Sequence, residues 1–132
     1  MAACGKGHLS AFKHLIEKGA DYKASDSTGT PVLNWSCVGG NVDIIDFLIA
    51  KGCDIHTPDN SGITPLMAAC CKGHLLAFNK LIGKGADYKA SDSTGCTVFN
   101  WSCVGGNVDI IDFLITKGCD IHKPNNNGNE HL

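Results

Sequence analysis

The sequence predicts an all-α solenoid, in which short helix-turn-helix units stack side by side and a projecting turn links each unit to the next. Two observations predict it. Residues 1–66 and 67–132 are identical at 51 of 66 positions, so the chain is a duplicated pair. A sparser skeleton recurs every 33 residues, beginning at Gly19, Gly52, Gly85 and Gly118. Periods of roughly 20–50 residues are typical of arrays in which each unit buries its apolar face against its neighbour.

The repeats divide one domain rather than two. A chain of 132 residues is long enough for a single core, and its composition gives no sign of a second folding unit. We therefore expect a single domain spanning 1–132. Its repeats fall approximately at 1–25 (partial), 26–58, 59–91 and 92–124, and 125–132 is the start of a further repeat or a tail.

Within each unit, the spacing of apolar residues predicts two helices. In the second unit these are Val32–Val38 and Val42–Lys51, separated by a break at Gly39-Gly40-Asn41. The second helices of units two and four are apolar around most of their circumference, as expected of helices packed between neighbours on both sides. Each second helix ends with Lys and then Gly, which predicts a left-handed stop at the same place in all four units.

The segments between units predict tight projecting turns. They read DSTG at 26–29, DNSG at 59–62, DSTG at 92–95 and NNNG at 125–128. Asp or Asn at the first position and Gly at the fourth are typical of type I turns. After the second of these turns, Thr64 and Pro65 are expected to open a helix, because Pro is favoured in a first helical turn.

Composition and charge exclude several classes of function. With a formal net charge of −2, the chain lacks the basic excess that nucleic-acid binding requires. Its apolar runs are far shorter than the roughly 20 residues that span a bilayer. The first residues have neither the basic nor the apolar region of a signal peptide. We therefore expect no nucleic-acid or membrane partner and a cytoplasmic or nuclear location, which is a reducing compartment.

The eight cysteines follow the repeat rather than a disulfide framework. Cys4, Cys37, Cys70 and Cys103 lie 33 residues apart, so they mark one repeated position. A small side chain that recurs once in each repeat behaves as a buried hydrophobe, and free Cys is among the most often buried residue types. We therefore expect reduced thiols that pack in the core. A second, less favoured interpretation places Cys71 on the exposed face as an oxidisable thiol.

The sequence predicts neither a metal site nor an active site. Cys53 with His56, and Cys119 with His122, each resemble half of a zinc site. The two pairs are two repeats apart, about 20 Å at a helix diameter of roughly 10 Å, so they cannot share one ion. Asp and His recur in the units next to helix ends and helix starts, where they have a structural role. Catalysis instead requires residues that converge on one pocket. We expect no catalytic residue, no metal and no cofactor.

The third unit carries the most specific pattern. It runs from Asp59 through Gly62, Thr64-Pro65-Leu66, Ala69 and Gly73-His74-Leu75 to Gly85-Ala86-Asp87. Together with the 33-residue period, this pattern resembles the ankyrin repeat, and the resemblance covers essentially the whole chain. Pro31 and Thr97 open the first helices of units two and four without the full Thr-Pro-Leu motif, although the helix start and the apolar packing are kept.

The resemblance implies an ankyrin-repeat solenoid that binds protein partners without catalysis, on a concave surface made by the turn tips and the first helices. Mapped residue by residue, that surface comprises Ser27, Thr28, Thr30, Val38, Asn60, Ser61, Ile63, Cys71, Lys72, Ser93, Thr94, Cys96 and Val104. This lining is mostly neutral and weakly polar. The alternative is a structural spacer in a larger multidomain protein, with no binding of its own.

Trp35 and Trp101 are open to two interpretations, as packing residues between repeats or as binding residues in the groove. They stand on the first helices of alternate units, and Ala2 and Ala68 occupy the same position in the other two, so large and small residues alternate along the stack. Trp is a frequent anchor at protein interfaces. The alternation nevertheless favours packing between repeats, with partial exposure to the groove as the other interpretation.

Neither end of the chain reads as a capped end of a stack. Terminal units need polar outer faces, yet Met1 matches the internal Met67, and the last unit keeps Ile111 and Phe113. We therefore expect a segment of a longer array or head-to-tail stacking between chains. Near-identical repeats would also arise by design, but differences such as His14 against Lys80 favour divergence after duplication.

Overall fold

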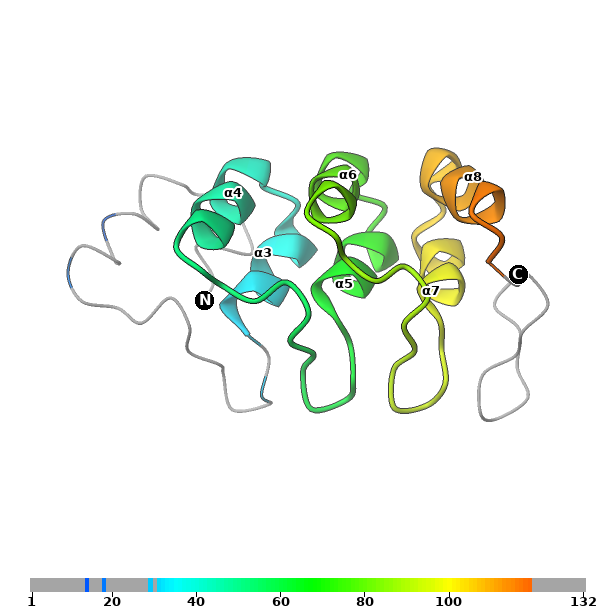
Figure 1. The fold of residues 1–132 in the computed structure, drawn as a ribbon, viewed down its shortest axis with the longest axis horizontal. Coiled ribbons are helices and arrows are strands. Elements are labelled where there is room, and N and C mark those ends of the chain that lie inside the picture. The colour runs from blue at the N-terminus through cyan, green and yellow to red at the C-terminus, as the bar shows by residue number, and fades with distance from the viewer. Residues whose placement is uncertain (1–13, 15–17, 19–28, 30, 120–132) are drawn as a thin grey trace.

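The computed structural model describes His14, Lys18, Gly29 and residues 31–119 (Figure 1). This part of the chain contains α3 (Val32–Gly39), α4 (Val42–Ala50), α5 (Pro65–Cys71), α6 (Leu75–Gly83), α7 (Val98–Gly105) and α8 (Val108–Thr116). No strand forms among the described residues, and the predicted all-α stack of helix pairs is confirmed. The helices expected in the first unit lie outside the described residues.

The helices form two rows. Helices α3, α5 and α7 lie side by side in one row and α4, α6 and α8 in the other, while the turns between pairs project beyond the first row (Figure 1). The middle pair, α5 and α6, is therefore packed on both sides. Its core side chains Leu66, Met67, Phe78 and Leu81 are fully buried, as expected of a unit with two neighbours.

Each first helix begins at a cap that its own sequence provides, with one exception. Thr64 Oγ1 accepts a hydrogen bond from the Met67 amide at 3.3 Å, and Pro65 is the first helical residue, as predicted. Thr97 and Asn100 form a reciprocal capping box. Pro31 occupies the cap position of α3 but makes no side-chain cap hydrogen bond.

The predicted helix ends are also confirmed. Lys51, Lys84 and Lys117 are the C-terminal caps of α4, α6 and α8, and the glycine after each has a positive φ between 81° and 92°. Only glycine adopts this conformation without strain, so the Lys-Gly pair fixes the helix length. The break inside the second unit is one residue shorter than predicted, because Gly39 still belongs to α3.

Neighbouring pairs approach closely through small residues and through hydrogen bonds from side chains to backbone carbonyls. A Cβ atom at Gly105 would overlap the carbonyl oxygen of Cys70, so glycine is required where α7 meets α5. A ring nitrogen of His74 lies 2.9 Å from the Val38 carbonyl oxygen, and Asn107 Nδ2 donates to the Gly73 carbonyl at 3.1 Å. These bonds tie the interhelical breaks of successive pairs to one another.

The six helices are short. No helix in the described part of the chain is both long enough and apolar enough to cross a membrane. The longest have 9 residues, which is less than half of the roughly 20 that a bilayer requires.

Candidate functional site

The two described turns that project from the stack are held by their first aspartate. Asp59 Oδ1 accepts hydrogen bonds from the amides of Ser61 at 2.8 Å and Ile63 at 3.0 Å. The amide of Gly62 closes the same turn on the Asp59 carbonyl at 3.0 Å. The next turn repeats this arrangement around Asp92, as the shared Asp-x-x-Gly pattern predicts.

The turns are also joined to one another and to the helices. Ser93 donates from its amide at 2.9 Å and from its hydroxyl at 2.7 Å to the carbonyl of Ser61, which lies in the preceding turn. Asn34 Nδ2, on α3, donates to the Ile63 carbonyl at 2.9 Å. Because each turn is bonded to a neighbouring unit, the tips form a fixed row rather than independent loops.

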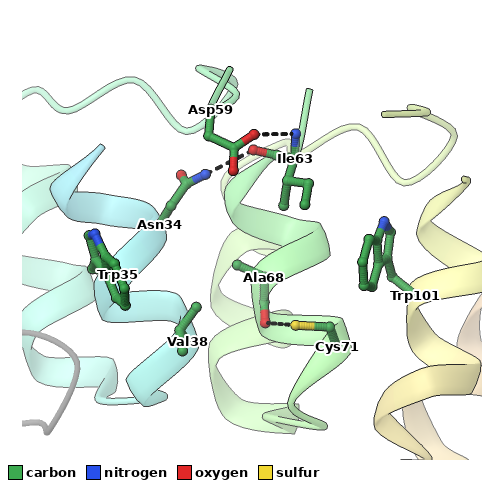
Figure 2. A pocket seen from close by; sticks show the side chains of 8 residues that line it. All are labelled: Asn34, Trp35, Val38, Asp59, Ile63, Ala68, Cys71 and Trp101. Carbon is green, nitrogen blue, oxygen red and sulfur yellow. Dashed lines mark hydrogen bonds between the residues drawn. The ribbon is translucent and has the colours of Figure 1, made fainter. Parts of the chain in front are cut away.

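An apolar pocket of about 210 Å³ opens beneath this row (Figure 2). It lies across the three first helices, with α5 between α3 and α7, and its lining surface is almost entirely apolar. The residues that line it are Asn34, Trp35, Val38, Asp59, Ile63, Ala68, Cys71 and Trp101. Pockets of this kind, apolar with a few polar groups at the edge, are the usual form of a binding site.

The two tryptophans form opposite walls of the pocket, and Ala68 lies between them (Figure 2). Both indoles are half-buried, so each packs against the stack and also faces the groove. The two interpretations of these residues are therefore compatible. The alternation of large and small side chains along the first helices creates the pocket, since an alanine between two tryptophans leaves their shared space unfilled.

One tryptophan is anchored to the turn above it. Trp101 Nε1 donates to Asp92 Oδ2 at 3.0 Å, while Asp92 Oδ1 accepts from the amides of Thr94 and Cys96. Burial alone would raise the pKa of Asp92, but the hydrogen bonds from Thr94, Cys96 and Trp101 outweigh it and lower the pKa. The hydrogen bonds therefore favour the ionised carboxylate, which holds the indole in place.

The predicted binding residues fall into three groups. Ser27, Thr28 and Thr30 lie outside the described residues. Of the others, Asn60, Ser61, Lys72, Ser93, Thr94 and Val104 are exposed, and Val38, Ile63 and Cys71 are half-buried. Cys96 is only 7% exposed, but it lines a small second pocket with Asn100, Trp101 and Val104, so its part in binding stays a prediction. Val38, Ile63 and Cys71 come together in the pocket.

The predicted surface omits several residues that line the pocket. These are Asn34, Trp35, Asp59, Ala68 and Trp101. The alternation of Trp and Ala at 33-residue intervals is a signal that could have located them, because it implies a space on the smaller unit. Asp59 lies half-buried beside that space because its turn folds back over the helices. The repeat pattern does not contain this information.

The Asp, His and Cys side chains of the described residues do not come together as a metal site would require. Asp54 Oδ1 accepts from the His56 amide at 2.8 Å, which lowers the pKa of Asp54 and is ordinary turn geometry. Among the described residues, no three His, Cys, Asp or Glu side chains are grouped as a metal site would require. His122, the partner expected for Cys119, lies outside the described residues.

The described cysteines are free thiols. Cys37 and Cys70 are fully buried, and burial raises the pKa of both thiols well above its ordinary value. Cys71, half-buried in the pocket, donates to the Ala68 carbonyl at 3.2 Å, and burial also raises the pKa of its thiol. A raised pKa disfavours the reactive thiolate, which argues against Cys71 as a readily oxidised thiol.

A comparison with protein families finds one matching model. The model, described as ankyrin repeats (3 copies), matches residues 1–92 and 48–125, two overlapping stretches that together cover most of the chain. No curated protein matches the sequence.

Proposed function

The chain belongs to the ankyrin-repeat family, and from this premise we propose that its groove of turn tips and first helices binds a protein partner. Ankyrin repeats generally mediate protein–protein interactions, and the family is typically non-enzymatic. The observation that carries the proposal is the apolar pocket beneath a fixed row of turns. A partner that fills it would remove apolar surface from water without having to order the loops around it.

The chemistry of the groove favours a neutral, partly apolar segment. Its exposed turn residues Asn60, Ser61 and Ser93 offer hydroxyl, amide and backbone groups, and Lys72 adds one cation beside the pocket. The pocket itself is apolar and centred on α5. Such a surface suits an extended peptide that places one large side chain in the pocket and lies along the turns through its backbone.

Selection from a displayed peptide library tests this function without a known partner. The protein is the bait, and each selected peptide is measured by isothermal titration against the Ile63→Asp variant and against the Leu76→Ser control. Ile63 lines the pocket, whereas Leu76 is an exposed apolar residue of α6, in the other row. We expect Ile63→Asp to weaken binding at least tenfold and Leu76→Ser to leave it unchanged.

If the library yields no peptide whose binding depends on Ile63, the groove is unused and the proposal is wrong. The alternative, a structural spacer without binding of its own, would then be favoured. Peptides that bind the Ile63→Asp variant and the native chain equally well would also argue against binding in this groove.

We also propose that the face of α7 and α8 that no later described helix covers associates head to tail with a second copy. Val108 is 65% and Ile115 47% exposed, yet their counterparts Val42 and Ile49 are half-buried beside the next pair. Residues 1–24 match residues 67–90 at 19 of 24 positions, so each chain carries a second version of the unit that normally covers this face. Such heterologous contacts generate an open chain when the rotation between copies does not close into a ring.

Sedimentation velocity over a range of concentrations tests this association. We expect the native chain to form a series of oligomers that grows with concentration, and Val108→Ser combined with Ile115→Ser to make it monomeric. The Leu76→Ser variant removes a residue that is 72% exposed on another face and serves as the control. A native chain that stays monomeric at millimolar concentration would contradict the proposal.

A reducing compartment, cytoplasmic or nuclear, is a further proposal for this chain. It is supported by the free thiols in the described residues, two of which are fully buried. Thiol titration of the protein unfolded without reductant, directly after isolation from its source, should return all eight cysteines. Recovery of fewer thiols would indicate disulfides and argue for an oxidising environment.

A further inference from the structure

The equivalent aspartates of two successive units, Asp59 and Asp92, differ in the hydrogen bonds that their carboxylates can accept. In the later unit, Trp101 Nε1 donates to Asp92 Oδ2 at 3.0 Å. The position 33 residues earlier is Ala68, and the corresponding aspartate is Asp59. An alanine has no donor, so the oxygen of Asp59 that corresponds to Asp92 Oδ2 cannot receive this indole bond from its own unit.

The space left by the missing indole is the pocket itself. Ala68 forms part of its lining, and Asp59 lies at its edge (Figure 2). Figure 2 shows one carboxylate oxygen of Asp59 bonded to the Ile63 amide, while the other points down toward the pocket. The carboxylate is therefore already oriented by the turn, and a donor entering the pocket would meet it without rearrangement of the backbone.

The pocket is large enough for an aromatic ring system. Its volume is about 210 Å³. By comparison, an apolar protein cavity of about 150 Å³ binds benzene. The walls are the two half-buried indoles of Trp35 and Trp101, against which a third ring could pack. Aromatic side chains gain from such contacts beyond the area that they bury.

We propose that this pocket binds a tryptophan side chain of the partner, which completes the row of indoles and donates its N–H to the carboxylate of Asp59. The proposal rests on the function proposed above, because it names the residue that the groove recognises. Phenylalanine would fill the space but cover the second carboxylate oxygen of Asp59 with carbon and supply no donor to it, which is unfavourable. Arginine would pair with the carboxylate, but its hydrated charge suits an apolar lining less well than indole does.

Small amides used as probes separate these occupants. N-acetyl-tryptophanamide, N-acetyl-phenylalaninamide and N-acetyl-argininamide are titrated into the protein, and the methyl signals of Ala68 and Ile63 are followed by NMR. We expect the tryptophan probe to shift both signals and to bind about tenfold more tightly than the phenylalanine probe, because of these two side chains only indole has a donor for the carboxylate. Equal affinity of these two probes, or tighter binding of the arginine probe, would overturn the proposal.

A matched pair of variants tests the carboxylate. Asp59→Asn keeps a carbonyl oxygen for the turn amides but replaces the acceptor that faces the pocket, so the preference for the tryptophan probe should disappear. Asp87→Asn is the control, since Asp87 also accepts a backbone amide two residues ahead, from Lys89 at 2.9 Å, but does not line the pocket. A preference that survives Asp59→Asn would contradict the proposal.

Filling the pocket gives an independent test. Ala68→Leu places extra carbon atoms where the ring would lie, so binding of the tryptophan probe should be lost, and circular dichroism shows whether the variant is folded. If it does not fold, the Asp59→Asn result decides. Library peptides that require Ile63 but contain no tryptophan would refute this inference while leaving the proposed binding function intact.

Discussion

Helix pairs α3/α4 and α7/α8 have nearly the same sequence but different surroundings. Residues 31–53 and 97–119 are identical at 20 of 23 positions. The backbones follow the same course, with a left-handed glycine after each first helix and an asparagine cap on each second one. Three positions differ: Pro31 against Thr97, Leu33 against Phe99 and Ala50 against Thr116. Two contrasts have structural consequences, namely the first residue of each pair and the face that the next pair covers.

The first difference begins at Pro31. In α7, the Thr97 amide donates to Asn100 Oδ1 at 2.9 Å, and the Asn100 amide donates to Thr97 Oγ1 at 3.0 Å. Proline has neither an amide hydrogen nor a hydroxyl. Asn34 Oδ1 is consequently buried and receives no hydrogen bond from the residues that the structure describes. One substitution therefore removes a capping box and leaves a buried acceptor unsatisfied.

The second difference arises without any substitution. Cys37 and Ile45 are fully buried, whereas their counterparts Cys103 and Ile111 are only half-buried. The α3/α4 pair is covered by α5 and α6, and α8 has no corresponding neighbour among the described residues. Identical residues thus contribute unequally to stability, because burial depends on the adjacent unit rather than on the residue itself.

The largest expected change in the free energy of unfolding comes from truncating the matched isoleucines, Ile45 and Ile111. Ile45→Ala should lower the free energy of unfolding by about 2–5 kcal/mol, since it removes a fully buried side chain and leaves a cavity. Ile111→Ala should cost about half as much, because its side chain is already partly in water. Urea unfolding followed by circular dichroism measures both, and equal losses would mean that the α8 face is covered in solution.

An exchange of the cap residues should have the next largest effect. Pro31→Thr should raise the free energy of unfolding by about 1 kcal/mol, because it supplies a cap and a donor for Asn34 Oδ1. Thr97→Pro should lower it by at least as much, since it orphans Asn100 Oδ1. Thermal unfolding of the two single variants checks the signs. A destabilising Pro31→Thr would show that the rigidity of proline outweighs the missing capping box.

The smallest effect is expected from the surface aspartates. Lys80 Nζ lies 3.0 Å from Asp46 Oδ1, but both side chains are well exposed, so Asp46→Asn should cost no more than about 0.5 kcal/mol. Its counterpart Asp112 is exposed on the open face, and Asp112→Asn should have no measurable effect on stability in dilute solution. A larger loss from Asp112→Asn would indicate that a second copy pairs with this residue.

Much of the fold was predictable because its signals are local. Thr64, Lys51 and Gly52 act within one helical turn of their own position, so their types fix where helices begin and end. The turn aspartates are equally local, since each bonds to amides two and four residues ahead. The candidate site was predictable only in part, because Asp59 and Ala68 matter through what the neighbouring units place beside them.

The sequence by itself determined the number of helices in each described unit and, to within about a residue, where they end. These depend on capping, turn and periodicity rules that operate within about ten residues. The tertiary structure decided how deeply each residue is buried and where a pocket opens. It buried Cys96, left Val108 exposed on a helix pair that no later described helix covers, and set Trp35 and Trp101 on either side of an alanine. Burial and shape are properties of neighbours in space, so identical sequences can acquire different roles.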